Sequence, residues 1–394
     1  MNRKNKEFLH AELPIYAIAF NSATHFVLSV SMNGLLHAFP EVKESILMYL
    51  LTIATLTGIA GGFLFSSLVC RFSKKNLTVG GMALGCLCAL VFLWFPTRLP
   101  LLFIAGGAHG LVSGFIATAF PLLVNDHVQE ERRSKVIGFG SGVIQFGRLT
   151  TLLLGGFLAG LRWNYVYFAY VFMLAALLIA LFLLPPDTPF GKGNTGWSKD
   201  GLGKLAKNLG VWQLTAITLT FGIVQFPSFS HASLYIEGYG LGPPSMTGSL
   251  TSLSCALAGL TGFLFAPIIR VTGKRTYCIA FLAVGIGFIC TGTVVSLPSI
   301  FGGLVCSTVA AAVFVPYSLL CVNRIADPET APIVMALIPA LMNLGSFLSP
   351  LIVNSLGAMI GVGAPADSFL SGGILSITLG LLILAAGHRI VCEP

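Results

Sequence analysis

Long runs of apolar residues follow one another along almost the whole chain, separated by short polar joints. We place twelve of them, near 14–36, 44–69, 76–95, 99–125, 136–161, 164–184, 211–236, 244–269, 276–296, 299–322, 332–357 and 366–387. A helix of about 20 residues covers the ~30 Å of hydrocarbon in a bilayer, whereas strands of a membrane barrel would alternate over about 10 residues. The pattern therefore predicts an all-α integral membrane protein with twelve transmembrane helices.

The composition supports this class of protein. The 394 residues are 55% hydrophobic and 9% charged, and the mean hydropathy is +0.89. Cytoplasmic loops of membrane proteins carry an excess of lysine and arginine. With the N-terminus in the cytoplasm, 18 of the 22 basic residues fall in inner segments; the others are Lys43, Arg98, Arg162 and, within a span, Arg148. We therefore expect a multi-pass protein of the cell membrane with both termini in the cytoplasm. The basic residues of the inner loops account for the net charge of +8, so we do not interpret this charge as a sign of nucleic-acid binding.

This topology can be tested with single cysteines in a background that lacks the nine native ones. Asn194→Cys should react with a membrane-impermeant thiol reagent only from the cytoplasmic side, because position 194 falls in the longest polar stretch between predicted spans. Pro40→Cys should react only from outside. Labelling of both positions from one side would contradict the twelve-span arrangement.

Short motifs recur about 200 residues apart and divide the chain into two halves. The sequence GFLF occurs at 62–65 and at 262–265, and a basic loop follows each copy (RFSKKN and RVTGKRT). Further on, QFGRLTTL from Gln145 matches NLGSFLSP from Asn343 at an offset of 198. The polar stretch at 185–210 is rich in glycine, proline and lysine, which is typical of a linker. We predict an N-terminal six-helix half at 1–190, a cytoplasmic linker at 191–210 and a C-terminal six-helix half at 211–394.

The basic loops resemble the signature G-x-L-x-D-R-x-G-R-K of the major facilitator superfamily, and in topology and repeat the resemblance covers essentially the whole chain. It implies the fold of that superfamily, in which two parallel six-helix repeats rock around a central site. It also implies a cytoplasmic gate motif, formed here by Arg71, Lys74, Lys75, Arg270, Gly273, Lys274 and Arg275. Cys70 and Arg270 stand where the motif has its aspartate, so the usual acidic latch of the gate is missing from both copies.

Two further patterns of the superfamily are matched in part. Where its fourth span often carries R-x-x-Q-G, this chain has GGAHG, with His109 in place of the glutamine. The fifth span is similar to the antiporter pattern G-x8-G-x3-G-P-x2-G-G: Thr151 and Leu152 replace Gly-Pro, while the other glycines match, namely Gly138, Gly147, Gly155 and Gly156. Small residues at helical spacing also let helices approach closely, and we favour this packing interpretation of the glycines.

Arg148 lies inside the fifth apolar run, roughly 18 Å from its inner end by the rise of a helix. All 14 Asp and Glu residues fall in loops, tails, the linker or the outermost turn of a span. A guanidinium that faced lipid would cost at least ~2.5–3.5 kcal/mol, so we expect it to face a cavity or a partner. One interpretation is structural, with Arg148 donating to carbonyls freed beside a bent helix. We favour binding of an anion, since arginine can hold a carboxylate through two parallel hydrogen bonds.

Other polar residues are predicted at a similar depth. His25 lies about 16 Å from the inner end of the first span, and His109 about 14 Å from the outer end of the fourth. With Arg148 they belong to a predicted substrate-binding set that also includes Asn21, Gln145, Gln225, Asn343 and, with weaker support, Tyr317. The resemblance implies that this set surrounds the path of the substrate. Taken singly, a histidine could instead bridge two helices, and the amides could hydrogen-bond between helices.

These observations predict a secondary active transporter of a small, anionic organic solute, and not an enzyme. The sequence shows no phosphate-binding loop and no cluster of metal ligands, so we expect no cofactor and no metal. Energy would come from exchange of an anion or from coupling to H⁺, for which His25 and His109 are the candidate carriers. Two alternatives stay open: a multidrug/H⁺ efflux antiporter, and a non-transporting membrane sensor or lipid-handling protein. We expect a monomer in the lipid bilayer, with the substrate and the coupling ion as its partners.

Overall fold

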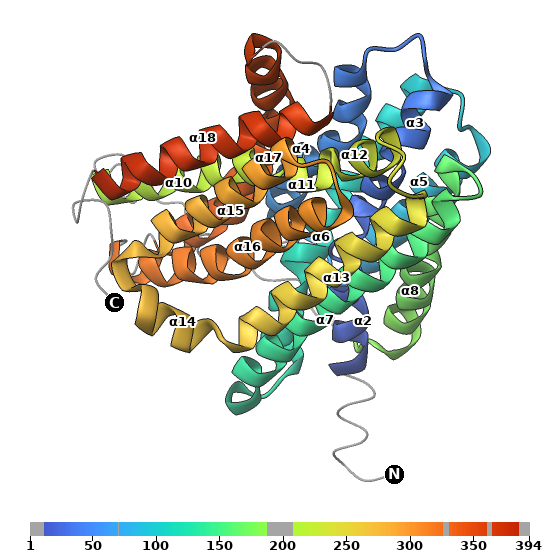
Figure 1. Ribbon diagram of the computed structural model, residues 1–394. Coiled ribbons are helices and arrows are strands. Elements are labelled where there is room, and N and C mark those ends of the chain that lie inside the picture. The colour runs from blue at the N-terminus through green and yellow to red at the C-terminus, as the bar shows by residue number, and fades with distance from the viewer. Residues whose placement is uncertain (1–11, 70, 187–207, 326–330, 361–364, 386–394) are drawn as a thin grey trace. The chain divides into compact units, whose positions relative to one another are not determined.

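The computed structural model describes residues 12–69, 71–186, 208–325, 331–360 and 365–385. Within these ranges all regular structure is helical, and Figure 1 follows the helices in chain order. The first six predicted spans correspond to α2 (Leu13–Phe20), η2 (Thr24–Ser31), α3 (Met32–Ala38), α4 (Glu44–Leu68), α5 (Lys74–Trp94), α6 (Leu99–His127), α7 (Glu130–Ala159), η3 (Trp163–Tyr170) and α8 (Val171–Leu183), where η marks a 3₁₀ helix. The later spans correspond to α10 (Leu209–Gln225), α11 (Pro227–Ser230), α12 (Ala232–Gly238), α13 (Pro244–Phe263), α14 (Phe265–Thr272), η4 (Gly273–Arg275), α15 (Thr276–Thr293), α16 (Leu297–Ile325), α17 (Ala331–Ile360) and α18 (Pro365–Ala385).

The all-α membrane fold expected from the hydropathy pattern is confirmed. Eleven stretches among the described residues are long and apolar enough to cross a membrane, and α13, with 20 residues, is a further long helix. It is less apolar because it carries serine, threonine and glycine at many positions (PSMTGSLTSLSCALAGLTGF). Large apolar side chains such as Trp94 and Phe182 are more than 70% exposed. Apolar surface of this kind is suited to contact with lipid.

The chain folds into two compact units, which we describe separately. Unit 1 comprises Met1–Gly193 and Pro244–Ser252, and unit 2 comprises Asn194–Pro243 and Leu253–Pro394. The first turns of α13 thus belong to unit 1, where the Ser252 hydroxyl donates to the Leu149 carbonyl oxygen over 2.9 Å. The linker predicted at 191–210 lies, apart from residues 208–210, outside the described residues, so it stays a prediction.

Glycines let helices within each unit approach at backbone distance. In unit 1, α4 crosses α6 so closely that a Cβ on Gly114 would lie 2.1 Å from the carbonyl oxygen of Gly58. In unit 2, a Cβ on Gly373 of α18 would lie 2.9 Å from the backbone nitrogen of Ile289 on α15. Helices in lipid associate through such close packing, because hydrophobic burial gives little driving force between them.

We expect Gly114→Ala to destabilise the protein by about 1–3 kcal/mol or more, because the new methyl group meets backbone atoms that cannot turn away. A suitable measurement is the thermal unfolding temperature of the purified protein in detergent. Gly80→Ala on α5 is the matched control: a Cβ there has nothing within 4 Å, and alanine favours helix over glycine. A Gly114→Ala variant as stable as the control would contradict the close crossing of α4 and α6.

Two spans are interrupted near their middle. The first changes from α-helix to a 3₁₀ helix after a turn at 21–23, where the Thr24 hydroxyl donates to the Asn21 carbonyl oxygen over 3.1 Å. In the seventh, α10 ends before Pro227, which has no N–H to donate, and a second break follows at His231. Side chains of Asn, Ser and Thr offer the backbone local alternatives to helical hydrogen bonds. The first span therefore continues as η2 after its break, and His231 lies at the second break of the seventh span.

Candidate functional site

Arg148 of α7 is half-buried and lies over an aromatic ring of the first span. Its guanidinium carbon is 5.0 Å from the centre of the Phe26 ring on η2. The Phe26 ring in turn lies 4.1 Å from the imidazole of His25, at an angle of 39°. A guanidinium over an aromatic face is attracted by the ring's electrons. The contact therefore fixes Arg148 beside the interrupted segment of the first span.

His25 and His109 line one small cavity inside unit 1. The lining comes from η2, α4, α5, α6 and η3, and it includes Cys88, Tyr167 and Tyr170. The space has room for about one water molecule. The structure thus brings together the two histidines that the sequence placed at similar depth. His25 is also close enough to His109 and Arg148 to interact electrostatically with both side chains.

Hydrogen bonding fixes one side of the His109 ring. Its Nε2 atom lies 2.9 Å from the Tyr170 hydroxyl, and both residues are buried. Within the described part of the chain, the Nδ1 atom of His109 and the Nδ1 atom of His25 have no hydrogen-bond partner. Buried polar atoms are usually paired with protein or with ordered water. The cavity therefore combines a largely apolar lining with two histidines whose Nδ1 atoms are buried and unpaired.

Asn21 and Gln145, the two amide residues of the predicted set in unit 1, differ in burial and in hydrogen bonding. Asn21 is buried, and its amide donates to the carbonyl oxygens of Ala17 at 3.0 Å and Phe172 at 3.4 Å. It therefore connects the broken first span to the sixth. Gln145 is half-buried on α7, one turn before Arg148.

Three members of the predicted set lie in unit 2. Gln225 is buried at the end of α10, and its backbone carbonyl oxygen accepts from Ser307 of α16 at 3.4 Å. Asn343 is half-buried on α17 at the level where this helix meets α10. Tyr317 lies ten residues beyond Ser307 on α16, a distance of about 15 Å along the helix axis. The centre of its ring lies 4.9 Å from that of Tyr277. Along α10, Asn343 lies near Gly222, whereas Ser349, six residues further along α17, donates to the Ile223 carbonyl oxygen. Gln225, Asn343 and Tyr317 therefore do not lie at one level.

His231 is a buried histidine that the sequence reasoning missed. Its Nε2 atom lies 3.2 Å from Oδ1 of Asn354 on α17, and its Nδ1 atom lies 2.8 Å from the Ser230 hydroxyl. The Ser368 hydroxyl of α18 also donates to Asn354 Oδ1, at 3.3 Å. Both ring nitrogens are therefore engaged, and the residue anchors the break in the seventh span to α17 and α18. The available signal was a polar run, SFSH, inside an apolar span.

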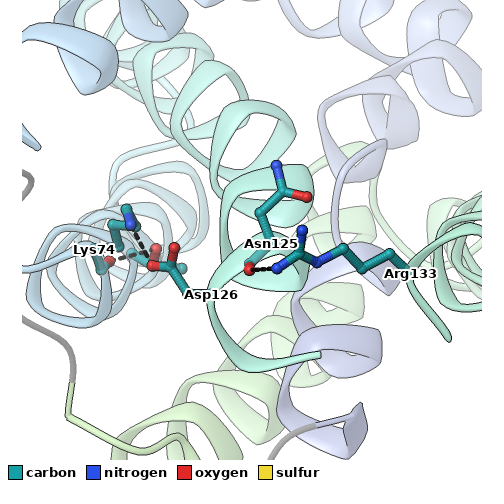
Figure 2. A network of polar contacts seen from close by, with 5 residues as sticks. Lys74, Asn125, Asp126 and Arg133 are labelled. Carbon is teal, nitrogen blue, oxygen red and sulfur yellow. Dashed lines mark hydrogen bonds and ion pairs between the residues drawn. The ribbon is translucent and has the colours of Figure 1, made fainter. Parts of the chain in front are cut away.

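The first gate motif has an acidic partner after all, supplied by another span. Lys74, at the start of α5, forms an ion pair with Asp126 near the end of α6, and their side chains are 2% and 25% exposed. Figure 2 shows this pair beside Arg133, which donates to the Asn125 carbonyl oxygen at 2.7 Å. Lys75 donates to the Leu184 carbonyl oxygen at 2.5 Å, just beyond α8. The basic residues of this loop therefore hold the ends of α6 and α8.

The remaining gate residues are less engaged with the core. Arg71, Arg270 and Arg275 are exposed, and Lys274 is half-buried. Gly273 has a φ angle of +49°, a conformation that glycine adopts without strain. This explains why the second copy of the motif keeps a glycine there. Cys70, at the acidic position of the first copy, lies outside the described residues.

Comparison with known proteins gives a family and a fold. The family model described as Major Facilitator Superfamily matches residues 14–350, and no curated protein matches. Three similar solved structures are a nucleoside transporter NupG (TM-score 0.80, 12% identity, 96% of this chain and 100% of that one), a peptide transporter POT in complex with sulfate (0.75, 14%, 99% of each) and a D-xylose–proton symporter (0.73, 17%, 100% and 99%). At these identities the structural likeness shows the fold alone.

Proposed function

The chain belongs to the Major Facilitator Superfamily, and on that premise we propose that it is a secondary active transporter of a small organic anion. The observation that carries the proposal is the guanidinium of Arg148, half-buried midway along α7 and stacked on Phe26. Charged residues deep in a membrane span are rare, and their default interpretation is functional. Arg148 brings a fixed positive charge and a planar fork of donors that matches a carboxylate.

The location of this charge favours a binding role over a purely structural one. Arg148 is close to an interrupted span, and interrupted spans in secondary transporters are typical of substrate sites. In a region of low dielectric, a positive charge attracts an anion much more strongly than it would in water. We place Arg148 and His25 at the centre of the proposed site, with Gln145 and His109 beside them. Gln225, Asn343 and Tyr317, which belong to unit 2, stay predictions from the sequence. Asn21 positions the first span.

The multidrug antiporter alternative receives less support from packing. A Cβ on Gly147 would lie 2.0 Å from the Phe20 carbonyl oxygen, and one on Gly155 would lie 2.6 Å from Val27. A Cβ on Gly156 would lie 2.7 Å from Cα of Gly248. Close helix contacts therefore account for these glycines of the fifth span without an antiporter mechanism. We propose a monomeric, non-enzymatic protein of the cell membrane, with both termini in the cytoplasm.

A ligand-stabilisation screen on the purified protein tests the proposal. The probes are organic anions (lactate, benzoate, succinate) and a lipophilic cation (tetraphenylphosphonium). A ligand that binds only the folded state stabilises it by about 2.7 kcal/mol at a hundredfold excess over Kd, so the melting temperature should rise in a saturable way with one or more anions. A rise with tetraphenylphosphonium and with none of the anions would contradict the proposal and favour the multidrug alternative.

A further inference from the structure

The short helix α14 is set apart from the two longer helices that it joins in unit 2. α13 ends at Phe263, and α14 begins after Leu264, whose carbonyl oxygen accepts a hydrogen bond from the backbone N–H of Ile268 at 3.0 Å. At the other end of α14 the chain turns through Gly273, with its φ angle of +49°, and through η4 before α15 begins. Figure 1 shows α14 as a separate helix between the ends of α13 and α15.

One face of α14 packs on the protein, and the opposite face is exposed. Phe265 and Ile269 are half-buried and stand at the i, i+4 spacing of one helix face. On the other side, Val271 is 88% exposed and Leu264, seven residues earlier, is 57% exposed. Arg270 is exposed beside Val271. The exposed face therefore combines apolar side chains with a guanidinium.

The charged residues of this segment are all basic. Arg270 and Arg275 are exposed, and Lys274 between them is half-buried. The sequence has no aspartate or glutamate from 238 to 326, so the segment contains no acid that would neutralise them. The excess of basic residues predicts a cytoplasmic position for this loop. Anionic lipids of the cytoplasmic leaflet attract basic segments that lie next to the membrane.

A lipid surface suits both components of the exposed face. Arginine lays its methylene groups along apolar surface and keeps its charged head at the polar boundary. Amphipathic helices with basic and large apolar residues lie in this way at the level of the headgroups. A free phosphate ion could meet the guanidinium groups, but it would leave Leu264 and Val271 in water. The combination of charge and apolar surface therefore favours a phospholipid over a soluble anion.

We propose that the exposed face of α14 is a binding surface for anionic phospholipid of the cytoplasmic leaflet. Arg270 and Arg275 hold the headgroup phosphate, because a guanidinium offers parallel donors to phosphate oxygens. Leu264 and Val271 contact the first carbons of the acyl chains. In this role the second basic loop fixes the junction of the eighth and ninth spans to the membrane surface. The inference goes beyond the proposed function and does not depend on the substrate.

Quenching of a fluorophore by lipid tests this surface on the full-length protein in nanodiscs. Val271→Cys, in the background without native cysteines, carries a bimane label. All discs hold the same equimolar mixture of phosphatidylcholine and phosphatidylglycerol, and only the lipid with brominated acyl chains differs. We expect brominated phosphatidylglycerol to quench at least about twofold more than brominated phosphatidylcholine, because two arginines concentrate the anionic lipid beside the label.

Three variants serve as comparisons. Arg270→Gln combined with Arg275→Gln should make the quenching by the two lipids equal, and each single substitution should reduce the difference in part. Arg162→Gln, at an exposed arginine of unit 1, is the matched control and should keep the difference. A label at Ile286→Cys, on an exposed position within α15, should be quenched equally by both lipids.

Equal quenching at Val271→Cys by the two brominated lipids would overturn the proposal, and so would the absence of quenching by either, which would place this face in water. Loss of the preference when inorganic phosphate replaces chloride at matched ionic strength would indicate a site for a free anion. A preference that persists in the double arginine variant would also contradict the proposal. If the double variant does not fold, the two single variants decide. None of these outcomes depends on transport of an organic anion, so the proposed function is tested separately.

Discussion

Asp126→Ala should lower the free energy of unfolding by about 3 kcal/mol, the lower part of the range for breaking a buried ion pair. Lys74 is only 2% exposed, so removal of the carboxylate leaves its ammonium buried without that counter-ion. We choose the lower part of the range because the Asp126 side chain is 25% exposed, and water can partly replace it. The pair also joins the start of α5 to the end of α6 (Figure 2).

The double variant Lys74→Met with Asp126→Leu separates charge from packing. Replacing both members of a buried pair with apolar residues of similar volume is often neutral or stabilising. The melting temperature should therefore fall by several degrees in Asp126→Ala and return near the wild-type value in the double variant. Arg71→Ala in the same loop is the control, because Arg71 is exposed and a surface substitution changes stability by about 0.5 kcal/mol at most. Wild-type stability of Asp126→Ala would show that the pair contributes nothing.

Arg148→Ala should weaken anion binding strongly and leave a folded protein. Loss of a charge-assisted hydrogen bond costs on the order of 1.5–3 kcal/mol, which is a drop in affinity of roughly ten- to a hundredfold. The fold should persist because water can enter the space that the guanidinium leaves. Arg148→Lys should bind less well than its retained charge suggests, since an ammonium cannot reproduce the planar fork.

Thermal stability and anion affinity measured on the same samples separate a binding role from a structural one. Arg162 gives a matched control: its guanidinium carbon also lies over an aromatic ring, 5.8 Å from the centre of Tyr165, but the residue is exposed. Arg162→Ala should retain anion binding. A heat-labile Arg148→Ala variant whose folded fraction still binds the anion would indicate a structural arginine. A stable variant with normal binding would contradict both roles.

Hydropathy was sufficient to predict the spans, because each run must cross the same thickness of lipid whatever its neighbours are. It could not predict the breaks at Asn21 and His231. Those depend on single side chains that hydrogen-bond to backbone or across spans, as in the Thr24 bond to Asn21 and the His231 bond to Asn354. The less apolar α13 was still predicted. Several of its hydroxyls donate within the helix, as Thr251 does toward the Thr247 carbonyl oxygen, and Ser252 instead donates to Leu149 of α7.

The sequence could predict one property of the candidate site, namely how deep in the membrane its polar residues lie. Rise along a helix placed His25 and His109 at matching levels, and the structure brings them to one cavity. Rotation about the helix axis is set by packing, so the sequence could not show that Arg148 stacks on Phe26. The acidic partner of Lys74 was missed for a similar reason: the motif covers one short loop, whereas Asp126 lies 52 residues away.

Uptake into proteoliposomes measures directly whether the protein transports an organic anion and whether Arg148 is needed. Vesicles that contain wild type, Arg148→Ala or Arg162→Ala are given radiolabelled lactate or benzoate, or labelled tetraphenylphosphonium. We predict saturable uptake of a carboxylate by wild type and Arg162→Ala, at least about tenfold less by Arg148→Ala, and no protein-dependent uptake of tetraphenylphosphonium. Equal carboxylate uptake by wild type and Arg148→Ala, or protein-dependent uptake of the cation alone, would contradict the account.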